Sequence, residues 1–322
     1  MLSLAIENLL SPVILCFALG LLAAIARSDL TIPEAVAKGM SIYLLFAIGF
    51  KGGVAVAAHG VDLNLILAMV AGIALSFLLP FIAFALLRAM TAISVTDAAA
   101  VAAHYGSISI VTFVTASSVL QGQGIAAEGY MVAVAAAMEA PAIISALWLA
   151  SRAGARSEGD HDLWREIFLN GSIVLLVGSF LIGMITGDKG MARIEAFIVA
   201  PFQGVLCLFL LDMGLVAGRG LAQAGKVLRG GTLAFGLVMP VIGATVSLAA
   251  GLALGLSVGG VALFMVLGAS ASYIAVPAAM RVALPEANPS LSLSLALGIT
   301  FPFNLTLGIP LYVAIAQIVT GG

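Results

Sequence analysis

Long apolar runs, separated by short polar segments, make up most of the chain. Cutting it at the charged residues and at the glycine- and proline-rich turns leaves ten mainly apolar runs of about 20 residues, the length that crosses a bilayer as a helix. These predicted spans cover residues 8–26, 34–51, 63–88, 94–120, 126–151, 166–187, 194–218, 231–254, 259–281 and 290–319. The pattern therefore predicts an all-α integral membrane protein with ten transmembrane helices.

Composition agrees with this interpretation and excludes several functions. Of the 322 residues, 62% are hydrophobic and 9% are charged, whereas soluble domains carry about 25% charged residues. Thirteen basic and fifteen acidic residues are too few to form a nucleic-acid surface. The sequence has no phosphate-binding loop, nucleophile elbow or Cys/His metal spacing, so neither an enzyme nor a bound cofactor is expected. No basic segment precedes the first apolar run, which we interpret as a retained span.

The basic residues predict the orientation in a bacterial inner membrane. If both termini are periplasmic, ten of the thirteen basic residues face the cytoplasm, and Lys51, Lys189 and Arg193 lie outside. This bias follows the positive-inside rule. Lys51 is placed at the outer end of the second span, where snorkelling to the surface would explain it.

A polar segment near the middle divides the chain into two similar halves. We expect residues 1–151 to form a first five-helix repeat, residues 152–165 a cytoplasmic linker and residues 166–322 a second repeat, which is inverted because five is odd. A constant offset of 165 supports the repeat. It pairs Gly49 with Gly214, Gly53 with Gly218, Gly106-Ser107 with Ala271-Ser272, and Glu139 with Asn304.

Two segments at membrane depth carry unusual clusters of polar and helix-weakening residues. They are residues 103–109 and residues 268–273, the second followed by Pro277. Irregular backbone is tolerated at this depth only inside protein or beside a wet cavity, and paired interruptions in two halves point to a transporter's binding site. The sequence therefore predicts two discontinuous helices, broken within 105–110 and 269–277, that cross near the membrane centre. The alternative is that the small residues only allow close helix packing.

Such a crossing would bring helix ends and hydroxyl groups to one point. The N-terminus of a restarted helix attracts an anion, and the carbonyl groups of a broken helix can hold Na⁺. The predicted substrate-binding residues are Gly106, Ser107, Ser109, Thr112, Ser270, Ser272 and Tyr273.

Ionisable side chains at membrane depth are further candidates, because burying them is costly. Glu139, beside Pro141, and its counterpart Asn304, beside Pro302, are predicted to couple transport to an ion, with Glu139, Ser109 and Ser272 as candidate Na⁺ ligands. A purely structural pairing of Glu139 is the alternative. His104 and Asp97 share one helix face, and the simplest interpretation of His104 is a hydrogen-bonded core residue.

One stretch in the second half is specific enough to indicate a family. The run from Gly268 to Pro277, then Arg281, then Pro285-Glu286-Ala287-Asn288-Pro289-Ser290 resembles the sodium-dependent bicarbonate transporter family of cyanobacteria and other bacteria. Similarity continues over nearly the whole chain, at residues 32–35, 48–53, 105–106, 138–141, 300–302 and 308–311. The chain departs from the family pattern at Tyr273, where the family has an acidic residue, and at residues 109–112, which are more apolar.

The resemblance implies an architecture similar to that of bile-acid sodium symporters, with a gate domain and a core domain each drawn from both repeats. It also implies Na⁺-coupled bicarbonate uptake by alternating access, a homo-oligomer and binding of a PII-like cytoplasmic regulator. A small organic carboxylate as substrate and a cation/proton exchange remain alternatives. A non-transporting membrane receptor is the alternative from a different class.

Overall fold

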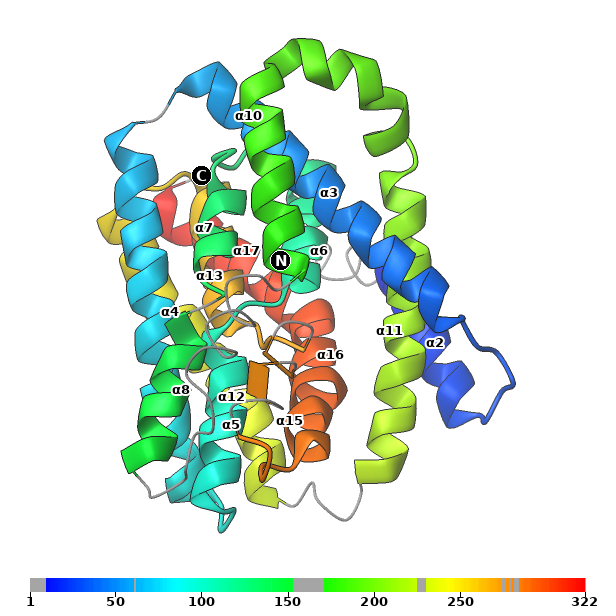
Figure 1. Ribbon diagram of the computed structural model, residues 1–322, viewed down its shortest axis with the longest axis vertical. Coiled ribbons are helices and arrows are strands. Elements are labelled where there is room, and N and C mark those ends of the chain that lie inside the picture. The colour runs from blue at the N-terminus through cyan, green and yellow to red at the C-terminus, as the bar shows by residue number, and fades with distance from the viewer. Residues whose placement is uncertain are drawn as a thin grey trace.

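The computed structural model describes residues 10–60, 62–139, 141–152, 171–224, 230–273, 276–277, 279–280 and 284–321. All regular structure in these ranges is helical (Figure 1). Eight helical segments are long and apolar enough to cross a membrane, namely Glu34–Ala58, Leu63–Met90, Val95–Gly122, Met131–Ala150, Val174–Ile198, Phe202–Gly220, Gly230–Ala253 and Pro289–Thr320. They correspond to eight of the ten predicted spans, and the other two contain shorter apolar helices, α2 (Pro12–Ile25) and α13 (Val258–Ala269). The all-α membrane class is therefore confirmed.

Four helices form a panel along one side of the molecule, seen on the right and upper part of Figure 1: α2, α3 (Glu34–His59), α10 (Gly171–Ile198) and α11 (Phe202–Ala224). Within it α3 packs on α10, and α2 packs on α11. A side chain at Gly49 would collide with Leu176 of α10, and one at Gly214 would collide with Phe17 of α2. Glycine thus lets two backbones touch, and the pair predicted at an offset of 165 has the same role in both halves.

The remaining helices form the core. They are α4 (Leu63–Met90), α5 (Val95–Gly106), α6 (Ile110–Gly122), α7 (Met131–Ala137), α8 (Pro141–Arg152), α12 (Gly230–Ala253), α13, α15 (Pro289–Leu295), α16 (Phe301–Phe303) and α17 (Ile309–Thr320). Long helix α4 packs on short helix α5, as α12 packs on α13. This matched packing is what two repeats would produce. The predicted linker lies outside the described residues, except Arg152 at the end of α8.

Several predicted span boundaries are wrong. The fifth span begins at Met131 and not at residue 126, because residues 123–130 form turns and irregular backbone. The second span does not end at Lys51, because the apolar residues 52–58 continue α3 until Gly60, which has φ 82°. Residues 194–198 do not begin the seventh span, because they belong to α10, which continues through a kink at Gly187. Gly187 has φ 55°, a conformation open to glycine at little cost, and the next span begins at Phe202.

The last span is helical throughout but contains two π-helical stretches, η1 (Ala296–Thr300) and η2 (Asn304–Gly308). Pro302 and Pro310 lie just after them and cannot donate a backbone hydrogen bond. The residue before each proline instead donates five positions back, as in a π-helix. The N–H of Phe301 donates to the carbonyl of Ala296, and the N–H of Ile309 donates to the carbonyl of Asn304. π-Bulges occur frequently at functional sites, and here they bring Thr300 and Asn304 into the core.

Candidate functional site

Regular helix stops in both segments where the sequence predicts a break. Helix α5 ends at Gly106 and α6 begins at Ile110, while α13 ends at Ala269 and residues 270–273 are not helical. Residues 274 and 275, within the second predicted break, lie outside the described part of the chain. Helices α5 and α13 each have 12 residues, and each has a serine N-cap and a serine C-cap.

The caps correct the register of the repeat at this point. Ser270 follows Ser107 by 163 positions, and Ser272 follows Ser109 by the same number, not by the predicted 165. The panel glycines Gly49 and Gly214 keep the offset of 165. The second half is therefore two residues shorter than the first between the panel glycine and the end of the broken helix. Ser107 therefore corresponds to Ser270, and not to Ser272 as predicted.

Hydrogen bonds join the two breaks directly, and we call residues 107–109 with 270–273 the crossing. The N–H of Ser272 donates to the carbonyl of His104 at 2.7 Å, and the N–H of Ser109 donates to the hydroxyl of Ser270 at 2.9 Å. Nδ1 of His104 lies 2.6 Å from the carbonyl oxygen of Ser272. Because a carbonyl only accepts, this nitrogen carries a proton and donates it. His104 is thus a hydrogen-bonded core residue, as the simpler interpretation predicted.

Buried hydroxyl groups extend this network. Thr112 donates through its hydroxyl to Ser109 at 2.9 Å, and Ser109 also caps α6 by accepting from the N–H of Thr112 at 3.3 Å. The hydroxyl of Ser270 donates to the carbonyl of Leu267 at 2.9 Å. The hydroxyl of Ser107, although buried, has no hydrogen-bond partner within the described residues. A bound polar group would supply what this hydroxyl lacks.

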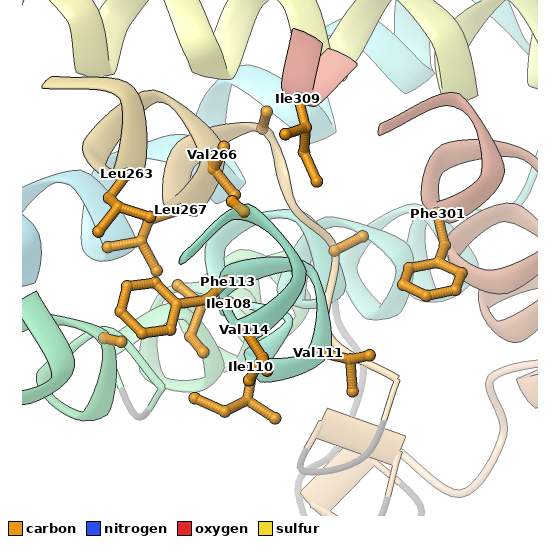
Figure 2. Close-up of a cluster of buried hydrophobic side chains, with 14 of the residues drawn as sticks. Ile108, Ile110, Val111, Phe113, Val114, Leu263, Val266, Leu267, Phe301 and Ile309 are labelled. Atoms are coloured by element: carbon orange, nitrogen blue, oxygen red, sulfur yellow. The ribbon is translucent and has the colours of Figure 1, made fainter. Parts of the chain in front are cut away.

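Apolar side chains surround the crossing. Figure 2 shows Phe113 of α6 in one cluster with Leu263 and Leu267 of α13, and Val111 on the same helix as Phe113. Tyr273, the last described residue of the crossing, is buried with its ring 5.4 Å from that of Phe301. These walls keep the dielectric constant low, so polar contacts made inside them are strong.

Both polar atoms of the Asn304 amide make hydrogen bonds within the core. Its Nδ2 donates to the carbonyl of Ala269, the last residue of α13, at 2.8 Å, and its Oδ1 accepts from the hydroxyl of Tyr312 at 3.1 Å. Among the described residues no hydrogen bond joins Asn304 to Glu139. The structure thus gives Asn304 a role at the crossing that the sequence did not predict, as a cap for the C-terminus of α13.

A second hydrogen-bonded contact within the core was not predictable from the sequence. The hydroxyl of Thr300 donates to the carbonyl of Gly236 at 2.8 Å, so it accepts from the hydroxyl of Tyr105 at 2.6 Å. This chain of bonds links α5, η1 and α12. Its members are 195 positions apart, and only the Thr-Phe-Pro run within the family resemblance pointed to Thr300.

Glu139 lies in the short irregular stretch between α7 and α8. Its side chain is 3% exposed, and its Oε2 has no hydrogen-bond partner among the described residues. The carbonyl of the preceding residue, Met138, accepts from the hydroxyl of Ser76 at 2.6 Å. A buried carboxylate must be protonated or hold a cation, so the geometry leaves an open oxygen where the sequence predicts an ion-coupling residue.

Two other acidic side chains, Asp97 and Asp212, have different surroundings. Asp97 accepts from the N–H of Asn288 at 2.8 Å and from the hydroxyl of Ser94 at 2.8 Å, and so fixes the start of α15 against α5. Asp212 is buried on α11, within the panel. We therefore keep Glu139 as the carboxylate most suited to an ion.

Two cavities lie between the panel and the core. The α3 cavity, of about 330 Å³, is bounded by α3, α6 and the segment before α7, and the α11 cavity, of about 530 Å³, is bounded by α11, α15 and η1. Helix α11 packs parallel to α2 and hence antiparallel to α3, so the C-terminal halves of α3 and α11 lie toward opposite ends of the molecule (Figure 1). The cavities therefore flank the core from opposite ends.

The two cavities use matching positions of the two halves. At an offset of 165, seven lining residues of the α3 cavity pair with seven of the α11 cavity: Lys51 with Val216, Gly52 with Ala217, Ala55 with Gly220, Ile125 with Ser290, Glu128 with Leu293, Gly129 with Ser294, and Val132 with Leu297. Positions 165 apart thus line both cavities, as they also make the close backbone contacts of both helix pairs.

Comparisons with known proteins agree with this architecture. No curated protein sequence matches the chain. The family model of the Na⁺-dependent bicarbonate transporter superfamily matches residues 12–317. A protein of this family is a transporter and not an enzyme. The chain, with its two broken helices and its paired cavities, belongs to the Na⁺-dependent bicarbonate transporter superfamily.

Proposed function

We propose that this protein is a secondary transporter that couples the uptake of a small anion, bicarbonate before others, to Na⁺ by alternating access. The observation that carries the proposal is the pair of cavities, which are built from matching positions of the two halves and lie at opposite ends of one core. Opening one cavity while the other closes would present the crossing to each side in turn. Family membership supports both the ion and the anion.

The crossing suits a small anion. The N-terminus of α6 carries a partial positive charge, and Ser107 offers a hydroxyl without a partner in the described chain. Ser109, Thr112, Ser270 and Ser272 surround this point, with Gly106 and Tyr273 beside them. Because Val111 and other apolar groups form the walls, a small organic carboxylate is the alternative substrate.

The proposed Na⁺ ligands are Glu139, Ser109 and Ser272, because carboxylate and hydroxyl oxygens suit a hard cation. Asn304 is proposed to act beside them by holding the end of α13. From the positive-inside rule we expect the α3 cavity and both termini to face the periplasmic side of a bacterial inner membrane. From the family resemblance we also propose that the protein forms a homo-oligomer and binds a PII-like cytoplasmic regulator.

Uptake of labelled bicarbonate into proteoliposomes tests the proposal. We expect accumulation when an inward Na⁺ gradient is applied, and none when K⁺ replaces Na⁺. Acetate and lactate, tested in parallel, distinguish the alternative substrate. If neither bicarbonate nor a carboxylate accumulates with Na⁺, the proposal is wrong. Movement of protons against Na⁺ without any anion, followed with an internal pH dye, would instead favour the exchanger that the open Glu139 oxygen permits.

A further inference from the structure

Lys51 lies well inside a membrane-spanning helix and not at its end. The candidate span continues to Ala58 and the helix to His59, so about 12 Å of helix follows Lys51 at 1.5 Å per residue. Snorkelling from a helix end therefore does not explain this lysine. An ionisable residue at such a position is a candidate for function.

The ammonium group of Lys51 faces the α3 cavity and is held there by an aromatic ring. Its Nζ lies 4.4 Å from the centroid of the Phe202 ring, at the start of α11. Lys51 lines the α3 cavity, and no ion pair or hydrogen bond of its ammonium is found within the described residues. A cation on an aromatic face is oriented but still has N–H groups to donate.

The other charged group of the cavity is already compensated. Glu128 accepts from the N–H of Ser257 at 2.7 Å and from its hydroxyl at 3.0 Å. Ser257 is the N-cap of α13, so this carboxylate lies at the positive end of a helix. Of the two charged groups that line the cavity, Lys51 is therefore the one without a hydrogen bond or an ion pair among the described residues.

The α3 cavity is lined by residues of the two helices that border the crossing, α6 and α13. Phe113 and Leu263, from the same apolar cluster that surrounds the crossing, form part of its wall, and Ser117 and Gln121 line it further along α6. The matching position of the α11 cavity is Val216. A fixed cation at this depth is thus present in one cavity and absent at the equivalent position of the other.

From this arrangement we propose that Lys51 is an anion-recognition residue of the α3 cavity, which binds the incoming small anion before it reaches the crossing. The inference rests on the proposed function, because it assigns one of the two cavities to the entry of that substrate. An anion bound between Lys51 and the hydroxyl groups of α6 would replace the contact with the Phe202 ring.

Uptake kinetics of Lys51→Met and Lys51→Arg test this role. Because one charge at contact distance contributes about 1 kcal/mol in a wet site, we expect Lys51→Met to raise the bicarbonate KM about fivefold. The kcat and the Na⁺ dependence should stay within about twofold of wild type, and the difference in KM should shrink at high ionic strength. Lys51→Arg keeps the charge and should stay within about twofold in KM.

Chemical rescue separates charge from folding. Lys51→Cys is made in a Cys16→Ala, Cys207→Ala background and treated with 2-aminoethyl methanethiosulfonate, which restores an ammonium, or with the neutral methyl reagent. We expect only the first reagent to return KM toward that of the parent. Equal effects of both reagents, or an unchanged KM in Lys51→Met, would overturn the assignment. Failure of the proposed function itself appears differently, as absent Na⁺-dependent uptake in the unmodified protein.

Discussion

Asn304→Ala is the substitution whose consequence the structure defines most sharply. It removes both hydrogen bonds of a side chain that is 1% exposed, and so leaves the carbonyl of Ala269 and the hydroxyl of Tyr312 without partners. Each buried polar group left alone costs about 1–3 kcal/mol, although interhelical bonds inside membrane proteins average nearer 0.6 kcal/mol. Between these limits we expect a loss of about 2–4 kcal/mol in the free energy of unfolding.

Thermal unfolding in detergent, with and without Na⁺, measures this loss. Thr306→Ala is the matched control, because its hydroxyl only bonds to Pro302 four residues earlier and its removal should cost under about 1 kcal/mol. If Asn304 acts by capping α13, the Na⁺ concentration at half-maximal uptake should stay within about twofold in Asn304→Ala. A stability loss no larger than that of the control, or a large change in Na⁺ dependence, would show that our assignment of Asn304 as a cap is wrong.

Three further substitutions separate the remaining roles. Glu139→Gln keeps the size of the side chain but removes the charge, so it should raise the half-maximal Na⁺ concentration about tenfold or more, and an unchanged Na⁺ dependence with lower thermal stability would leave only a structural pairing. Ser109→Ala combined with Ser272→Ala should raise the bicarbonate KM while far-ultraviolet circular dichroism stays the same; an unchanged KM would remove the hydroxyls from the substrate site. Gly214→Leu places a side chain against the carbonyl of Phe17, only 2.2 Å from its first carbon, and should abolish the folded protein in size-exclusion chromatography, whereas the open position Gly204 should tolerate alanine with a normal elution profile.

The class of fold and the location of the breaks were predictable because both follow from local composition. Apolar length defines a span, and a cluster such as Tyr105-Gly106-Ser107 cannot lie in lipid as an ordinary helix. The glycine pair 165 positions apart predicted matching helix contacts for a similarly local reason. At Gly49 and Gly214 the neighbouring backbone is so close that no larger residue fits.

Contacts between distant residues were not predictable from one sequence. Nothing local shows that Tyr105 reaches Thr300 or that Asn304 turns toward Ala269 instead of Glu139. The position of Lys51 has the same kind of cause: its charge alone does not end the span, because the apolar residues 52–58 continue the helix. A basic residue ends a span only if the chain beyond it cannot remain helical in the bilayer.

The bonds across the crossing have a consequence for how the protein is made. The N–H of Ser109 donates to the hydroxyl of Ser270, which is 161 positions later in the chain. At about 5–20 residues per second of synthesis, the polar segment 107–109 is inserted roughly 10–30 s before the second half exists to satisfy it. During that interval the N–H of Ser109 has no partner from the second half, so we expect this segment to stay in contact with water or the insertion machinery until α13 is in place.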